Sequence, residues 1–339
     1  MVKLNKDFYS IGKETKLFRL IEKLNSTVFK YSEFGVLVAF IVVFLFFLLF
    51  ANRFATLANF RTVLMVTTEL GIMTIGVTFL MVAGEFDLSV GSVFGFSILI
   101  CTILANTGLN SILAFIITII ITSSIGFING LITLKASIPS FIVTLGMQMF
   151  IRGIMLSVSS GFIISYTGDN LIPMILGREI ISFISHSTLI LFALLMLFSI
   201  ILNKTRLGIW ILATGADKES ARQVGVNIYK TKMICFIIAG IMAGFAGMVN
   251  LSRFKIADVL MGQGMELEAI AATVIGGTLL TGGRGSIIGA FLGVLITGMI
   301  RSGLILLGAP TFWYRSFIGL ILVIVAIINS YMMKIKRKR

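Results

Sequence analysis

The chain has 339 residues, of which 58% are hydrophobic and 12% charged, and its net charge is +14. A soluble globular domain carries about 25% charged residues. This composition and a mean hydropathy of +1.07 therefore exclude an ordinary soluble fold and predict an all-α, polytopic membrane helix bundle. Seven basic residues precede Ser32, six lie in 204–232 and five in the tail 334–339. Their clustering beside apolar runs indicates membrane topology rather than nucleic-acid binding.

The first segment, 1–33, is a cytoplasmic leader of mixed polarity that precedes the first apolar run. Its apolar side chains share one stripe of a helix, with basic residues beside them: Leu17, Leu20, Ile21, Leu24 and Val28. This pattern is typical of a helix that lies on the cytoplasmic membrane surface, and a partly disordered tail is the alternative. No small-residue cleavage site follows the first apolar run, so we expect no cleaved signal peptide.

Apolar runs long enough to cross a bilayer follow one another through the transmembrane domain, 34–333, because a span needs about 20 apolar residues. We predict about ten spans, at 34–51, 63–83, 90–106, 112–134, 138–158, 187–203, 233–251, 266–281, 286–306 and 312–333. An even number of spans places both termini and the loop 204–232 on one side, which the positive-inside rule makes the cytoplasm. Eight spans would give the same orientation.

Two predicted spans, 90–106 and 266–281, are short and border charged or glycine-rich stretches. Such segments often end in mid-membrane and line a cavity, although a shift in the assigned ends would explain them equally well. Glycine is abundant, with 34 residues, and several recur at every fourth position. This spacing predicts helix faces on which neighbouring backbones approach closely, with hinges as the alternative. The glycines assigned to such faces include Gly240, Gly244, Gly283, Gly285, Gly289 and Gly293.

The polar residues offer no catalytic or metal-binding pattern. Neither a GxxxxGK[ST] phosphate loop nor a GxSxG nucleophile motif occurs, and His186 is the only histidine. Cys101 and Cys235 both fall in apolar runs, where cysteine is expected as a buried small hydrophobe. We therefore expect no enzymatic activity, no cofactor and no metal site in this chain.

The longest polar stretch between spans is 204–232, with ATGADKESARQVGVN at its centre. Its Glu219-Ser220-Ala221, followed three residues later by Gly225, resembles the EAA-xxx-G signature of permease subunits of ATP-binding-cassette importers. Residues 213–247, with the run AGIMAGFAGM, are similar to the corresponding region of the ribose, xylose and galactose permease family. The segment GEFDLSVGS at 84–92 and the block GGTLLTGGRGSIIGAFLG at 276–293 match two further segments of that family, in the family's order.

Some residues depart from the family pattern. Ser220 replaces the second alanine of the loop signature, no Leu-Pro pair follows Gly225, and Glu85 and Phe86 replace a Gly-Ile pair. Residues 87–89 read Asp-Leu-Ser where nucleoside-type relatives carry Asn-Ile-Gly, which favours a sugar over a nucleoside. These residues do not fix which sugar.

The resemblance implies the membrane-spanning permease subunit of an importer that moves a monosaccharide of ribose, xylose or galactose type across the bacterial cytoplasmic membrane by alternating access. It also implies cytoplasmic ATPase subunits, an external sugar-binding protein and a second permease subunit, identical or not, within membrane lipid. Glu219, Ala221 and Gly225 would form the coupling element, a short helix whose small Ala221 enters a groove on the ATPase and which ends at the Gly225 turn.

Two alternative functions stay open. The first is a permease of the same class for another small solute, such as a furanone signal of the autoinducer-2 type or a nucleoside. The second is an ion-coupled secondary transporter, in which Glu85 or Asp87 would bind a proton or a sodium ion.

The signature segment, which includes Gly84, Glu85, Asp87, Ser89 and Gly91, places two carboxylates between apolar runs. In the predicted topology this segment lies at a cytoplasmic junction. There, Asp87 or Ser89 would cap the helix that begins near position 90, and a negative charge would suit that helix's dipole. A role in gating or subunit contact, or as a direct ligand, is the alternative.

Overall fold

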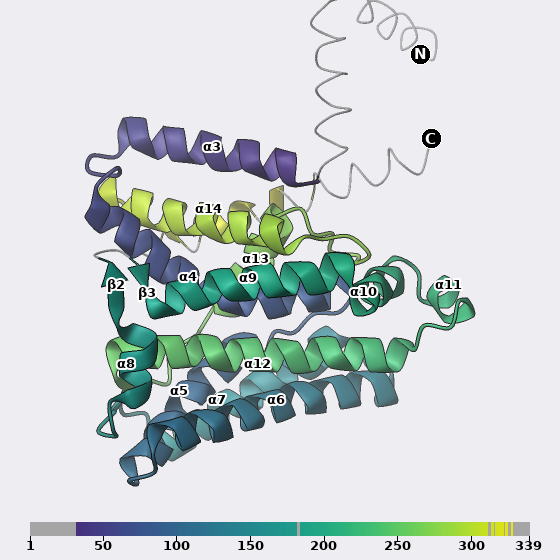
Figure 1. The fold of residues 1–339 in the computed structure, drawn as a ribbon, viewed down its shortest axis with the longest axis horizontal. Helices are drawn as coiled ribbons and strands as arrows, with labels where there is room; N and C mark the ends of the chain where they lie inside the picture. Colours follow the sequence, from purple (N-terminus) through teal and green to yellow (C-terminus); the bar gives the residue numbers. More distant parts are fainter. Residues whose placement is uncertain are drawn as a thin grey trace, which may run out of the picture.

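The computed structural model describes residues 32–181 and 184–310 and, C-terminal to these, residues 313, 314, 316–321, 323, 324 and 327. In this part of the chain, long helices lie side by side in one bundle (Figure 1). Six of them are long and apolar enough to cross a membrane, so the predicted all-α membrane bundle is confirmed. The predicted surface helix of the leader and the basic tail lie outside the described residues.

The helices differ in length and role. The long ones are α3 (Ser32–Phe50), α4 (Leu57–Val82), α5 (Val90–Asn106), α6 (Ser111–Ala136), α7 (Ser140–Ser159), α9 (His186–Lys204), α12 (Ile228–Phe254) and α14 (Ile287–Leu306). The short ones are α8 (Leu171–Gly177), α10 (Arg206–Ala216), α11 (Lys218–Gln223) and α13 (Met265–Ile275). Two small antiparallel ribbons pair β1 (Ile164–Ser165) with β4 (Ile256–Ala257) and β2 (Glu179–Ile181) with β3 (Ile184–Ser185).

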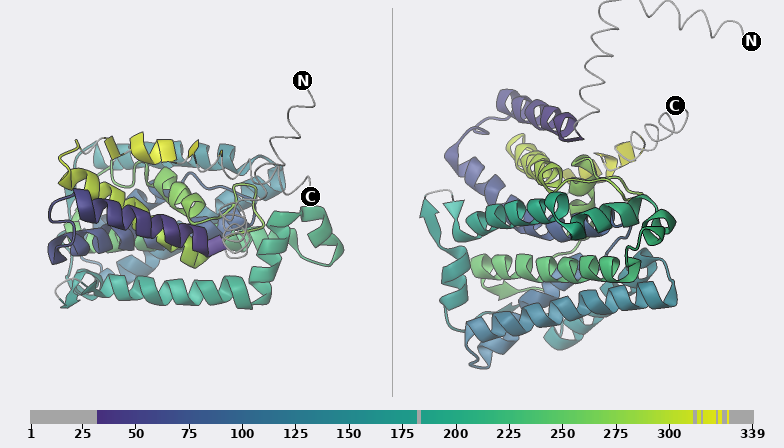
Figure 2. Two further views of the ribbon diagram at one scale, coloured as in Figure 1. Left: turned by 90° about the horizontal axis from the view of Figure 1, so that it is seen from above. Right: turned by 45° about the vertical axis from the view of Figure 1, so that its right-hand side comes forward.

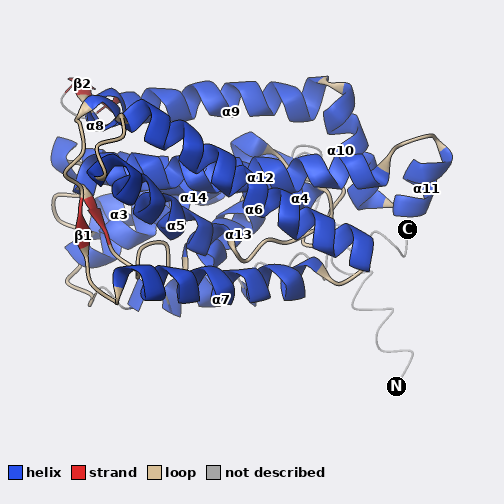
Figure 3. Ribbon diagram, turned by 90° about the horizontal axis from the view of Figure 1, so that it is seen from below, coloured by secondary structure: helices blue, strands red, loops and turns tan. Residues whose placement is uncertain are grey.

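The bundle has two distinct ends, visible in Figures 1 and 3. We call one the α11 end; it holds α11 and the connections 83–89, 137–139, 205–227 and 276–286. We call the other the strand end; it holds β1 to β4, α8 and the connections 51–56 and 107–110. Each long helix runs from one end to the other, as the views in Figure 2 also show.

The predicted spans correspond to helices, with one clear exception. Residues 266–281 do not form a full span, because α13 ends at Ile275 and its 11 residues extend only about 16 Å. Residues 276–286 are instead turns that return to the α11 end and contact the ends of α4 and α10. The span predicted at 312–333 is described only in part. A total of ten spans therefore stays a prediction.

Helices α4 and α12 form the centre of the bundle and are buried over most of their length, whereas α6, α7 and α9 bury only one side. Small residues allow the central helices to approach closely. A Cβ on Gly76 of α4 would lie 2.7 Å from the Cα of Ala239 in α12. On another face of α12, Gly240 and Gly244 pack against Thr122 of α6 with no room for a side chain.

The predicted glycine face at 283–293 needs a correction at two positions. Gly289 and Gly293 lie on α14 and pack against the backbone of Gly276 and Ala272. Gly283 and Gly285 precede the helix, which begins at Ile287. They let the connection 276–286 approach two helix ends closely, because Gly283 packs against Ala216 of α10 and Gly285 against Val82 of α4.

Candidate functional site

Three segments that are far apart in the sequence meet at the α11 end: the connection after α4, the end of α10 and the connection before α14. The backbone N–H of Gly283 donates to the carbonyl of Val82 at 2.8 Å. A Cβ on Gly282 would lie 2.8 Å from the Cα of Gly84, and a Cβ on Gly215 would overlap the Val82 carbonyl oxygen. The three sequence blocks that carry the family resemblance therefore form one contact site, and glycine is needed where their backbones touch.

Gly84 ends α4 and redirects the chain toward α5. Its φ of +78° is in the left-handed region, and its N–H donates to Met81 while that of Glu85 donates to Leu80, at 3.0 and 2.9 Å. These two bonds are those of a helix end closed by a left-handed glycine. Gly84 therefore has a conformational role as well as a packing role.

The first two turns of α7 hold the segment that follows Gly84. The backbone N–H of Phe86 donates to Ser140 Oγ, and that of Leu88 donates to Thr144 Oγ1, each at 3.0 Å. Backbone N–H groups without a partner are costly when buried. Ser140 and Thr144 therefore fix the path of the chain between α4 and α5.

Asp87 is buried, with 3% of its surface exposed, and it belongs to a small polar network. Its Oδ1 accepts hydrogen bonds from the Ser89 N–H at 2.7 Å and the Ser89 hydroxyl at 2.6 Å. Asn129 of α6 donates to Ser89 Oγ at 2.9 Å and, more weakly, to Asp87 Oδ2 at 3.4 Å. The network ties the start of α5 to α6.

The predicted helix cap is correct only in outline. Ser89 is the N-cap residue of α5, but its side chain makes no capping hydrogen bond. The Asp87 carboxylate accepts the N–H of the N-cap residue itself and not one from the first turn. Gly91, in that first turn, has no room for a side chain because Glu266 and Gly262 pack against it.

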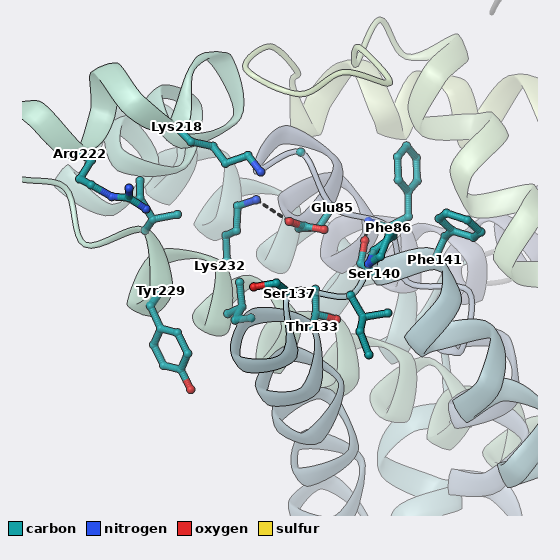
Figure 4. Close-up of a pocket in the computed structure, with 15 residues that line it drawn as sticks. Glu85, Phe86, Thr133, Ser137, Ser140, Phe141, Lys218, Arg222, Tyr229 and Lys232 are labelled. Carbon is teal, nitrogen blue, oxygen red and sulfur yellow. Dashed lines mark hydrogen bonds and ion pairs between the residues drawn. The ribbon is translucent and has the colours of Figure 1, made fainter.

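Glu85 forms an ion pair with Lys232 of α12, and the Lys232 side chain is only 3% exposed. The pair forms one wall of a pocket of about 600 Å³ between the 84–89 segment, the α6–α7 connection and the 204–232 loop. Figure 4 shows the Lys218 side chain of α11 extended toward this pair. The signature segment and the 204–232 loop are therefore joined by charge as well as by backbone contact.

Helix α11 is short, and residues next to it in the sequence cap both of its ends. Asp217 is its N-cap and accepts hydrogen bonds from the Glu219 N–H at 3.0 Å and the Ser220 hydroxyl at 2.8 Å. These bonds, with that from Ser220 the stronger, hold the pKa of the Asp217 carboxyl below its ordinary value. Gly225, with a φ of +85°, ends the helix in a left-handed turn.

The structure corrects the expected role of Ala221. This side chain is 3% exposed and faces the rest of its own chain, so it does not enter a partner's groove. The other residues of α11 are exposed, and among them Glu219 and Arg222 form an ion pair at 3.3 Å. Val224, the residue that follows the helix, is 78% exposed.

Sequence reasoning missed the partners of the signature segment. Lys232 was counted only as a basic loop residue, and Ser140, Thr144 and Asn129 were counted only as parts of apolar spans. The available signal was a polar side chain within or beside an apolar run, since such residues are costly in a membrane unless they have partners.

Among the described residues, no group of three His, Cys, Asp or Glu side chains could hold a metal ion.

Comparison with known proteins shows clear relatives. A family model described as branched-chain amino acid transport system / permease component matches residues 59–326. The chain is 36% identical to the autoinducer 2 import system permease protein of Photorhabdus luminescens over 259 residues, 76% of this chain and 78% of that protein. It is 30% identical to the L-arabinose ABC transporter permease protein of Azospirillum brasilense over 298 residues, 88% and 87% of the two chains.

A further relative is the ribose import permease protein of Escherichia coli strain K12. The chain is 30% identical to it over 282 residues, which are 81% of this chain and 86% of that protein. No solved structure matches the chain significantly.

Proposed function

The chain belongs to the family described as branched-chain amino acid transport system permease components, and on this premise we propose that it is the membrane-spanning permease subunit of an ATP-driven importer for a monosaccharide. The relatives are named as permeases for L-arabinose and ribose. In this proposal the chain itself hydrolyses no ATP. It forms the path for the solute and receives force from ATPase subunits.

The observation that carries the proposal is the contact site beneath α11. An exposed short helix projects from the end of the bundle. The loop that bears it contacts the end of α4 through Gly215 and Val82 and is tied to it by the Glu85–Lys232 pair. Movement of α11 by an ATPase would therefore displace the junction between α4 and α5. An ion-coupled carrier needs no such element.

The orientation follows from the distribution of basic residues. The α11 end carries the six basic residues of 204–232 together with Lys135 and Arg284, whereas the strand end carries Arg53, Arg61, Arg178, Arg253, Lys255 and Arg301. Each end has two of its basic residues in ion pairs: Arg222 with Glu219 and Lys232 with Glu85 at the α11 end, and Arg61 with Glu179 and Arg253 with Glu69 at the strand end. The positive-inside rule then places the α11 end in the cytoplasm, where ATP is available. With an even number of spans, both termini lie there too.

The remaining partners follow from the class of importer. We propose that two ATPase subunits bind at the α11 end, that an external sugar-binding protein delivers solute at the strand end, and that a second permease subunit, identical or not, completes the path. A furanone signal is a second candidate substrate, because the relative from Photorhabdus luminescens is named as an autoinducer 2 permease.

Purification with the candidate partners tests the proposal. The chain is co-expressed with an ATPase and a binding protein of the same host, and ATP hydrolysis by the purified assembly is measured with and without D-ribose, L-arabinose or D-xylose. We expect the ATPase to co-purify and one sugar to stimulate hydrolysis through its binding protein. A chain that purifies alone and accumulates solute in response to a proton gradient would contradict the proposal.

A further inference from the structure

A second polar pocket lies at the strand end, away from α11. It has a volume of about 550 Å³, within the range of small-ligand sites. Its walls come from α4, α5, α12, α13, α14 and the connection between α12 and α13. The polar side chains that line it are Glu69, Asn250, Arg253, Gln263, Glu268, Arg301 and Tyr314.

The charges of this pocket balance. Glu69 forms an ion pair with Arg253. The second carboxylate, that of Glu268, accepts a hydrogen bond from the Tyr314 hydroxyl at 3.1 Å, and the Arg301 guanidinium lies 5.3 Å from the centroid of the Tyr314 ring. Two carboxylates and two guanidinium groups give no net charge. A balanced site of this kind favours a neutral polar ligand over an anion or a cation.

One polar atom of the pocket lacks a partner. Asn250 of α12 is 8% exposed and donates through Nδ2 to Glu69 Oε2 at 2.9 Å. Its Oδ1 is buried and accepts no hydrogen bond from any residue that the structure describes. A buried acceptor without a donor is costly, and the pocket that Asn250 lines is the space from which a ligand could supply that donor.

We propose that this pocket binds a neutral, polyhydroxylated solute as it enters the permease, with one solute hydroxyl donating to Asn250 Oδ1. The exposed Arg301 supplies donors to solute oxygens, and the rings of Phe94 and Phe254, which also line the pocket, supply apolar contact. This inference rests on the proposed function as a sugar importer and adds a contact site within the permease itself.

The position of the pocket suits a transport step. Asn250 and Lys232 lie on the same helix, 18 residues and so about 27 Å apart. Lys232 is tied to the junction after α4, and Arg253 is tied to Glu69 within α4. Two of the helices that line the solute pocket, α4 and α12, are therefore also contacted by the α11 loop at the other end of the bundle.

The inference is tested by measuring sugar binding to the permease directly. The external sugar-binding protein is left out, because its own affinity for the sugar would dominate the measurement. The transported sugar is first identified with the complete importer. Its binding to the purified permease–ATPase complex is then measured by saturation-transfer difference NMR, with L-leucine as a neutral zwitterion for comparison. The variants are Asn250→Leu, which removes the acceptor, and Arg301→Met, which keeps the apolar stem of an exposed side chain. Thr118→Val is the matched control, because Thr118 is buried in α6, does not line the pocket, and donates its hydroxyl to the Ala114 carbonyl within α6.

We expect saturable binding of the transported sugar, at least about tenfold weaker in Asn250→Leu and in Arg301→Met and unchanged in Thr118→Val. Unchanged affinity in both folded pocket variants would overturn the inference, as would saturable binding of L-leucine in place of the sugar. If the complete importer transports a sugar that the permease–ATPase complex does not bind, the inference about the pocket is wrong and the proposed function stands. If the importer transports none of the sugars, both the inference and the proposed function are wrong.

Discussion

The Glu85 carboxylate and the Lys232 ammonium form an ion pair that joins the segment after α4 to the second turn of α12, with side chains 14% and 3% exposed. At the other end of α12, Arg253 pairs with Glu69 in the middle of α4. Between the two pairs, Gly76 lets α4 approach Ala239 of α12. Contacts therefore join α12 along its length to the half of α4 that leads to the α11 end.

Breaking the Glu85–Lys232 pair from one side should be worse than removing it. Lys232→Met leaves a partly buried carboxylate without its cation, and the loss of one partner of a buried pair typically costs about 3–5 kcal/mol. The double variant Glu85→Gln, Lys232→Met removes both charges and should recover much of that loss. Thermal unfolding of the purified permease in detergent measures the difference. Equal stability of the single and double variants would show that the two charges do not interact.

Replacing Asp87 should separate hydrogen bonding from charge. Asp87→Asn keeps an oxygen that can accept from the Ser89 N–H and hydroxyl, whereas Asp87→Leu leaves both donors unsatisfied at a cost of about 1–3 kcal/mol each. We expect uptake per inserted protein to fall further in Asp87→Leu than in Asp87→Asn. Complete loss of uptake in both variants at normal membrane abundance would instead indicate that the negative charge is required.

The exposed residue after α11 should matter for ATPase binding and not for folding. Val224→Asp places a charge on a side chain that is 78% exposed, so membrane abundance should stay normal while retention of the ATPase falls about tenfold or more. The matched control is Ile163→Asp, which changes a side chain that is 58% exposed at the strand end. ATPase retention equal to wild type in Val224→Asp would remove α11 as the contact surface.

Bulk at the meeting point of the three sequence blocks should be destabilising. In Gly215→Ala the added methyl would overlap the Val82 carbonyl oxygen, so the contact site must open and the amount of folded protein should drop. Gly146→Ala in α7 is the control, because nothing lies within 4 Å of its Cβ position and alanine favours a helix by about 1 kcal/mol. Size-exclusion profiles of the two variants should differ, and identical wild-type profiles would contradict the close contact.

The proposed orientation predicts opposite labelling of two introduced cysteines. The native Cys101 and Cys235 are buried, which keeps the background low. Val224→Cys at the α11 end should react with a membrane-impermeant maleimide only after the cells are opened. Ile163→Cys at the strand end should react in intact cells. The reverse pattern would invert the assigned topology, and labelling of both in intact cells would contradict a bundle that spans the membrane.

Much of this architecture was predictable because lipid imposes it. Long apolar runs that cross a membrane must be helical, so the positions of these runs in the sequence located the region from α3 to α14. The exception, 266–281, misled the prediction because Leu279 and Leu280 keep the mean hydropathy high after Ile275 although the helix ends there. A hydropathy window measures transfer into lipid and does not register where a chain turns.

The candidate site was predictable in its parts and not in its contacts. The three blocks that include Gly84, Gly215 and Gly283 were identified separately, but pairing across long sequence separations is not encoded in local periodicity. The burial of Ala221 was missed for the same reason, since a six-residue helix does not reveal which side faces the bundle. Glu69 and Asn250 carried the strongest unused signal, because polar side chains within a span need partners.

Uptake into proteoliposomes tests the central claim most directly. The permease is reconstituted with its ATPase, the loaded sugar-binding protein is added on the strand-end side, and radiolabelled sugar is followed with ATP supplied on the α11 side. We predict accumulation that requires ATP, persists when a protonophore dissipates the proton gradient, and is lost in Val224→Asp while the protein stays inserted. Accumulation that needs the proton gradient and continues without ATP would contradict an ATP-driven permease.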